Sequence, residues 1–269
     1  MRGTRPWRLA ATAIVIGLAG VACGGSDGEP EAAATNSPPA VATAAEPTQE
    51  AASAAPSPVP TESLPPGAVQ GLDDYGADGM LDPTCGTQDF GAGLVLRIPC
   101  EITTPNEPEY GSRLIQDSLY RLPGSIDINL DGISGSLLLA RDDAGTKVVI
   151  VVFNSDNLFA TGSDVLGSTD TMDNTIKLIN STFPGGILQV RGHTDATGSA
   201  SGNQALSERR AAAARQYLLD HAVDATEVTA VGLGSSRPIA EEANPDGSPD
   251  PEGQSFNRRV EIVLRLPAS

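Results

Sequence analysis

The stretch of sequence that decides the fold is the apolar run Val148-Val149-Ile150-Val151-Val152-Phe153. A continuous run rich in β-branched residues is typical of a strand that is buried on both faces, because a strand with one wet face alternates apolar and polar residues. Sheets with two covered faces occur mainly where helices pack on them. The run therefore predicts a strand inside a layered α/β fold.

The residues after this run alternate between helix and strand patterns. Apolar side chains recur at helical spacing over residues 168–183, and Pro184 and Gly185 end that amphipathic helix. Asn203 is a good N-cap for a second helix that runs to about His221. Further strands are expected at residues 187–191, 228–231 and 260–264, with a long polar loop before the last. Residues 146–269 thus predict an α/β layer sandwich of βαβαββ type, with helices on a mixed sheet.

The preceding residues, 67–145, read as a small β-rich module. Strands are expected at 94–98, 125–130 and 136–140, and the turn at 141–146 suggests a hairpin into the apolar run. The module is acidic, with 13 Asp and Glu against four Lys and Arg. It is too small for a large core of its own, so docking on the next domain would help it fold.

Three cysteines indicate the compartment. Cys85 and Cys100 lie fifteen residues apart and can form a disulfide outside the cytosol, which would stabilise the fold by about 3 kcal/mol. Two free thiols in a reducing cytosol are the alternative. Neither cysteine has a CxxC or HxxC neighbour, so no metal site is predicted.

The N-terminal region has the pattern of an export signal followed by a flexible tether. Residues 1–22 combine three Arg with an apolar run at 9–22, which is typical of a secretory signal and too short to span a membrane permanently. Gly20-Val21-Ala22-Cys23 resembles a bacterial lipobox, which implies a lipid on Cys23; ordinary cleavage and an uncleaved anchor are the alternatives. Residues 23–66 have too little apolar surface to fold and predict a disordered tether.

Charge argues against nucleic acid as a partner. The chain has 17 Lys and Arg against 34 Asp and Glu, a net charge of -17, and it contains no basic run. Binding through phosphate neutralisation needs clustered Lys and Arg. No nucleic-acid interaction is therefore predicted.

Three separated motifs carry a resemblance to a known family. They are Gly192-His193-Thr194-Asp195, then Asn203, Leu206-Ser207 and Arg210-Ala211 in the pattern N-x-x-L-S-x-x-R-A, and Asn257-Arg258-Arg259-Val260. Residues 147–264 thus resemble the OmpA C-terminal domain family, whose members bind peptidoglycan non-covalently. The signal and tether resemble those of peptidoglycan-associated lipoproteins, although residues 67–145 are not part of that layout.

The resemblance implies a ligand and a set of binding residues. In the family the ligand is the diaminopimelate of the stem peptide; the positions of Asp195 and Arg210 hold its ammonium and carboxylate, and Asn203, Arg258 and Thr194 lie in the same pocket. The residue types fit, because Asp195 follows a strand end, Arg210 lies on the next helix, and a guanidinium fork binds two carboxylate oxygens. A purely structural Asp195–Arg210 ion pair is the alternative.

Three further residues qualify this resemblance. Gly162 stands where many members carry Asp or Asn, so we expect the loop after the first strand to supply no side-chain contact. Gln254 stands where a basic residue is frequent, so the last loop is less cationic. His193 is expected to be a structural hydrogen-bonding residue rather than a ligand.

Together these features predict a non-catalytic envelope lipoprotein, without cofactor or metal, that is exported, faces the peptidoglycan and ties a membrane to the wall. An envelope hydrolase would need a nucleophile–base pair or two positioned carboxylates in a cleft, and the sequence offers no Ser-His-Asp order, no zinc set and no catalytic Cys-His pairing. The alternative function is that of a surface adhesion protein, in which residues 67–145 bind an unknown partner while the OmpA-like domain only anchors it.

Overall fold

The computed structural model describes residues 64–75, 79–100, 114–115, 118–123 and 132–267. The predicted signal, the lipidation residue Cys23, nearly all of the tether and the strand expected at 125–130 lie outside the described residues. In the part of the chain that is described, no helix is both long and apolar enough to cross a membrane.

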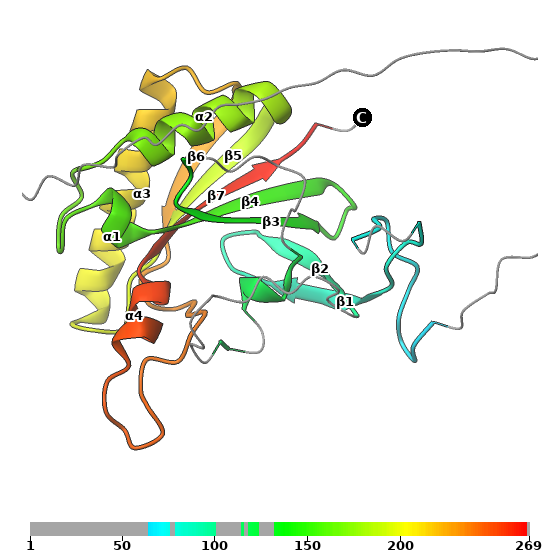
Figure 1. Ribbon diagram of the computed structural model, residues 1–269, viewed down its shortest axis with the longest axis horizontal. Coiled ribbons are helices and arrows are strands. Elements are labelled where there is room, and N and C mark those ends of the chain that lie inside the picture. Colours follow the sequence, from blue (N-terminus) through cyan, green and yellow to red (C-terminus); the bar gives the residue numbers. More distant parts are fainter. Residues whose placement is uncertain (1–63, 76–78, 101–113, 116–117, 124–131, 268–269) are drawn as a thin grey trace, which may run out of the picture. The chain divides into compact units, whose positions relative to one another are not determined.

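A five-stranded mixed sheet forms the centre of the fold, in the order β3-β4-β7-β5-β6 (Figure 1). Every neighbouring pair is antiparallel except β5 and β6, which are parallel. The mixed α/β fold predicted from the sequence is therefore confirmed. The strands are β3 (Gly135–Arg141), β4 (Lys147–Asn154), β5 (Gly186–Gly192), β6 (Ala225–Gly232) and β7 (Arg259–Arg265).

Strand β4 is buried on both faces, as its apolar run predicts. Val149, Val151 and Phe153 belong to one hydrophobic cluster. Val148, Ile150 and Val152 belong to a second cluster on the opposite face. Two layers therefore cover the sheet, one on each side.

Helices α2 (Asp170–Thr182) and α3 (Ala200–Asp220) cover the first face of the sheet, the one that carries Val149, Val151 and Phe153 (Figure 1). Both helices were predicted, but the prediction that Asn203 caps the second one is wrong. The N-cap is Ser199, whose hydroxyl accepts a hydrogen bond from Gly202 N–H at 3.1 Å. The helix begins one turn earlier than predicted because Ser199, an equally good cap, comes first in the chain. There are also two short helices in the described residues: α1 (Ser155–Leu158) directly follows β4, and α4 (Pro251–Asn257) directly precedes β7.

A disulfide-linked hairpin covers the second face. Its strands are β1 (Thr84–Asp89) and β2 (Val95–Pro99), and the sulfur atoms of Cys85 and Cys100 lie 2.10 Å apart at its open end. Apolar side chains of the hairpin and of the 3-10 helix η1 (Leu119–Arg121) pack on β3 and β4 in the second cluster. Because β3 is the edge strand of the main sheet and its side chains join the second cluster, the segment 67–145 shares its core with residues 146–269.

The tip of this hairpin is held by polar side chains of the sheet and of the loop after β6. Its five successive carbonyl groups, from Asp89 to Gly93, each accept a hydrogen bond from one of these side chains. The backbone at Gly91, Ala92 and Gly93 has positive φ angles, which turn the chain so that the carbonyls face the sheet. The donors are Gln189 and Arg191 on β5, Arg265 on β7, and Arg237 in the loop after β6.

A buried charged cluster lies beneath this tip. Glu261 is fully buried, and its carboxylate oxygens lie 2.9 Å from Arg191 Nε, 2.7 Å from Arg259 Nη2 and 3.2 Å from His193 Nε2. Burial, followed by the charge of Arg259, lowers the pKa of His193 to about 4. Burial alone would raise the pKa of Glu261, but His193, Arg259 and Arg191 hold it well below its usual range. His193 thus lies in the interior, on the far side of the sheet from the long helices.

Candidate functional site

The candidate site lies where three chain segments meet at one edge of the sheet. Strand β7 is antiparallel to both β4 and β5, so its beginning lies beside the ends of these two strands. The polar residues that follow β4 and β5 are therefore brought next to Arg258, which directly precedes β7. This topology joins residues that are far apart in the sequence.

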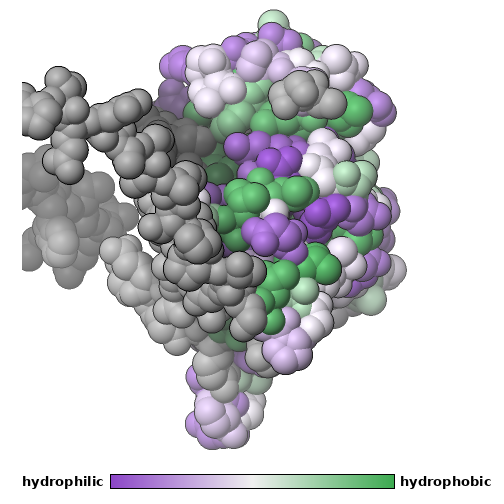
Figure 2. Space-filling model, turned by 90° about the vertical axis from the view of Figure 1, so that its right-hand side faces the viewer, coloured by the Kyte–Doolittle hydropathy of each residue, from purple (hydrophilic) through white to green (hydrophobic). Residues whose placement is uncertain are grey.

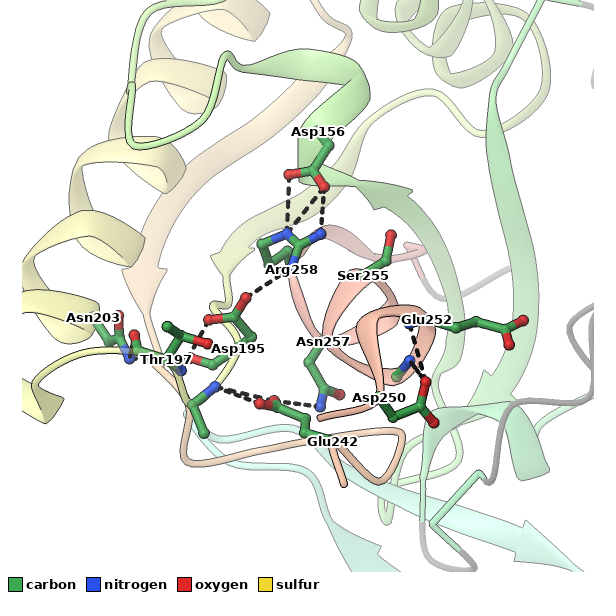
Figure 3. A network of polar contacts seen from close by, with 12 residues as sticks. Asp156, Asp195, Thr197, Asn203, Glu242, Asp250, Glu252, Ser255, Asn257 and Arg258 are labelled. Atoms are coloured by element: carbon green, nitrogen blue, oxygen red, sulfur yellow. Dashed lines mark hydrogen bonds and ion pairs between the residues drawn. The ribbon is translucent and has the colours of Figure 1, made fainter. Parts of the chain in front are cut away.

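Arg258 bridges two carboxylates at this edge (Figure 3). Its Nη1 donates to Asp195 Oδ2 at 2.7 Å, and its Nη2 and Nε donate to the Asp156 carboxylate at 2.7 Å and 3.0 Å. The hydrogen bond to Asp156 raises the pKa of the Arg258 guanidinium above its ordinary value, against the opposing effect of burial. Arg258 therefore remains a cation shared by two anions.

The Asp195 carboxylate is fixed on two sides. Its Oδ1 accepts a hydrogen bond from Thr197 N–H at 3.0 Å, while Oδ2 is bound by Arg258. The side chain is 13% exposed, compared with 40% for Asp156. A ligand would meet an oriented Asp195 and a more open Asp156.

Arg210 lies close to this cluster, but it does not form the structural ion pair with Asp195 that was the alternative. Its Nε donates to Ser163 O at 2.9 Å, its guanidinium lies 5.3 Å above the centre of the Phe159 ring, and the residue is 2% exposed. Among the described residues it forms no ion pair, so the cation on Asp195 is Arg258 and not Arg210. Burial lowers the pKa of Arg210, and the nearby charges of Asp156 and Asp195 oppose that shift.

Asn203 and Thr194 support the loop after β5. The Asn203 amide donates to the carbonyls of Asp195 and Thr197 at 3.0 Å and 3.1 Å, which closes this loop against α3. Thr194 is 5% exposed and its backbone N–H donates to Gly234 O at 3.0 Å. The Thr194 hydroxyl is buried and has no hydrogen-bond partner among the described residues.

The short helix α1 that follows β4 contributes a side chain that the sequence motifs do not identify. Asp156 in α1 binds Arg258, whereas the expectation that the loop around Gly162 supplies no side-chain contact to the ligand stays a prediction. Gly162 has a φ of 72° and serves a turn instead. The missed signal was an acidic residue directly after a strand end, which is the pattern that identified Asp195.

The assembled site is a polar cluster that contains charges of both signs. Two carboxylates and two guanidiniums converge, and no group of His, Cys, Asp and Glu in the described ranges could hold a metal ion. Such a cluster can bind a ligand that carries both an ammonium and a carboxylate.

Comparison with known proteins matches residues 158–250 to the OmpA family. The chain is 45% identical over 87 residues to outer membrane porin F of Pseudomonas aeruginosa, covering 32% of this chain and 23% of the relative. It is 42% identical over 81 residues to the peptidoglycan-binding protein ArfA of Mycobacterium tuberculosis H37Rv, covering 30% and 23%. The chain thus spans less than a quarter of the length of these relatives.

Among solved structures, the chain also matches the peptidoglycan-associated lipoprotein from Burkholderia pseudomallei, with 23% identity and a TM-score of 0.30; the match covers 40% of this chain and 85% of that one. The motifs quoted above from residue 192 to residue 211 fall inside the matched family range. Residues 158–250 of this chain are thus similar to the OmpA family.

Proposed function

We propose that this protein binds peptidoglycan non-covalently through the diaminopimelate of the stem peptide. The observation that carries the proposal is the Asp195 carboxylate, which is oriented by Thr197 N–H and Arg258 at the open edge of the sheet. A free amino-acid centre carries an ammonium and a carboxylate side by side. Asp195 and Asp156 complement the ammonium, and Arg258 with Arg210 complements the carboxylate. The OmpA family match and the likeness to ArfA support the same ligand class.

We further propose that a lipid on Cys23 ties the protein to a membrane of the cell envelope. The segment from residue 23 to residue 66 would reach about 35–40 Å as a flexible coil, which separates the folded part from the membrane surface. Incorporation of labelled palmitate into wild type but not into Cys23→Ser tests the anchor. Equal labelling of the two proteins would exclude Cys23 as the lipidation site.

Retention on purified peptidoglycan tests the ligand. Asp195→Asn removes the oriented charge and is expected to lower retention at least tenfold, because a charge-assisted contact of about 1.4 kcal/mol is lost. Asp220→Asn is the matched control, since Asp220 is exposed at the C-terminal end of α3 and its carboxylate accepts a hydrogen bond from Gln216 rather than from a residue of the cluster. Equal retention of wild type and Asp195→Asn would exclude this binding mode.

Contact with another protein through residues 67–145 is the second candidate function. Five of the eight large hydrophobic side chains that are exposed in the described residues belong to this region or its start: Leu64, Val69, Leu72, Met80 and Leu81. On the face shown in Figure 2, however, hydrophobic residues lie in separate patches between hydrophilic ones. Loss of cell-surface binding in a Val69→Ser, Leu81→Ser variant that still binds peptidoglycan would favour this function.

A further inference from the structure

A carboxylate outside the ligand-facing cluster connects the two segments that build the site. Glu242 lies in the loop between β6 and α4, and both of its oxygens accept from Ala196 N–H, at 3.0 Å and 2.8 Å. Its Oε1 also accepts from Asn257 Nδ2 at 2.7 Å. Ala196 follows Asp195 in the chain, and Asn257 precedes Arg258. Glu242 therefore touches the immediate neighbour of each member of the Asp195–Arg258 ion pair (Figure 3).

Asn257 is a fixed support for this contact. It is fully buried, and its Oδ1 accepts from the N–H groups of Ile239 and Ala240 at 2.7 Å and 3.1 Å. Its Nδ2 donates to Ala240 O at 2.9 Å and to Glu242. Both acceptor sites and both N–H groups of the amide are thus used, so the side chain has no alternative orientation of equal energy.

The contacts close a ring. One side of the ring is the ion pair between Asp195 and Arg258, and the other is the path from Ala196 through Glu242 to Asn257. A loop joined to a strand at one point can rotate about it, whereas a loop joined at two points cannot. The second connection fixes the direction in which Asp195 presents its carboxylate.

The backbone around Glu242 is held as well. Ala240 forms a β-bridge with Leu114, and Ile115 N–H donates to Ile239 O at 2.9 Å. Helix α4 packs so closely on the loop that a Cβ on Gly253 would lie 1.8 Å from Glu241 O. Glu242 therefore projects from a loop whose backbone is held in place by its neighbours.

We infer that Glu242 is a positioning residue of the ligand site: it holds the Asp195 loop against the start of β7, so that Asp195 and Arg258 meet the ligand in one arrangement. The inference rests on the proposed function. Glu242 acts through Ala196 and Asn257 and is not itself assigned a ligand contact.

Glu241 supplies a matched control for the test. It carries the same charge one residue away, is exposed, and among the described residues its carboxylate makes no hydrogen bond or ion pair. Glu241→Ala therefore removes the charge without removing the contact. Any effect that Glu242→Ala has beyond that of Glu241→Ala reports the contact itself.

The first measurement needs no ligand. Amide hydrogen exchange at Ala196 and Thr197 in the full chain is expected to be at least tenfold faster in Glu242→Ala than in wild type, and unchanged in Glu241→Ala. Glu242→Gln keeps one carbonyl oxygen for the Ala196 N–H and is expected to be intermediate. Equal exchange in Glu242→Ala and Glu241→Ala would overturn the inference.

The second measurement is the affinity for the tripeptide L-Ala-γ-D-Glu-meso-diaminopimelate, determined by calorimetry well below the melting temperature of each variant. Glu242→Ala is expected to bind about tenfold more weakly than wild type, with partial recovery in Glu242→Gln and less than a twofold change in Glu241→Ala. Affinities of Glu242→Ala and Glu241→Ala that agree would again overturn the inference. Absence of binding by wild type would overturn the proposed function instead, and the exchange result would still decide the role of Glu242.

Discussion

At the scale of single residues, the geometry of Arg258 is the most demanding feature of the site. One planar guanidinium uses Nη1 for Asp195 and the Nε–Nη2 edge for Asp156. A lysine has the charge, but its three N–H groups leave one nitrogen, so it cannot present a planar fork to Asp156 while it binds Asp195. The bridge therefore depends on the shape of the cation as well as on its charge.

Arg258→Lys is accordingly expected to weaken peptidoglycan binding about tenfold, because roughly one charge-assisted hydrogen bond of about 1.4 kcal/mol is lost. Pull-down retention at several protein concentrations measures the effect. Arg209→Lys is the control, since Arg209 is 52% exposed and its pair with Asp164 is long, at 3.6 Å. If Arg258→Lys and Arg209→Lys bind alike, the bridge has no role in the ligand affinity.

The sequence predicts which residues belong to the site better than it predicts their partners, because the partners lie far apart along the chain. The motifs placed Asp195, Arg210 and Arg258 in one site, but they did not indicate that Arg258 forms the ion pair with Asp195. Motif spacing places side chains on elements but does not say which guanidinium meets which carboxylate. That choice depends on the start of β7 lying beside the end of β5, across 63 residues of chain.

At the scale of elements, the β1–β2 hairpin depends on side chains of the sheet. Arg191 is 1% exposed, holds the carbonyls of Phe90 and Gly91, and faces Glu261. Arg265 holds Gly93 O at 2.8 Å, but its side chain is 24% exposed and its distance to Asp142 is 3.9 Å. The two arginines thus serve the same tip in very different environments.

Arg191→Gln is expected to lower the free energy of unfolding by about 3–5 kcal/mol, because it leaves a buried carboxylate with one cation fewer. Arg265→Gln is expected to lower it by less than about 1 kcal/mol, since water can replace an exposed donor. Urea denaturation of both variants measures the difference. If both variants lose a similar amount of unfolding free energy, the burial of Arg191 adds nothing to its contribution to stability.

The hairpin also marks a limit of prediction at this scale. Strand β4 and the two long helices follow from local periodicity, which the sequence displays directly. The docking of the hairpin tip joins Gln189 to a residue 97 positions away and Arg265 to one 172 positions away. No local pattern reports such contacts, so residues 67–145 read as a module of their own although they share a core with the sheet.

At the scale of the whole molecule, the buried charged cluster links stability to pH. The pKa of His193 falls from 6.5 to about 4 on folding, so between these values the unfolded chain binds more protons than the folded one. The stability that neutral His193 provides is therefore complete above about pH 6.5 and is lost as the pH falls toward 4. A shift of this size corresponds to about 3 kcal/mol.

His193→Gln is expected to reduce the slope of unfolding free energy against pH between 6.5 and 4. Urea denaturation at half-unit pH intervals measures it. His221→Gln is the control, because His221 is exposed at the end of α3 and the cluster remains intact. A slope in His193→Gln equal to that of wild type would place the acid sensitivity elsewhere. Glu261 contributes in a separate window, below its ordinary pKa of 4.5.

The disulfide of the hairpin has a mechanical consequence. Cys85 and Cys100 are separated by 15 residues of chain, but their Cα atoms lie 4.8 Å apart. When tension is applied at residue 64 and resisted at the ligand site, the covalent path crosses the sulfur–sulfur bond, and residues 86–99 bear no load. Without that bond, the same pull would open β1 from β2 pair by pair and lengthen the link by up to about 50 Å. The disulfide thus keeps β1 paired with β2 and prevents the chain between residue 64 and the ligand site from lengthening at the hairpin.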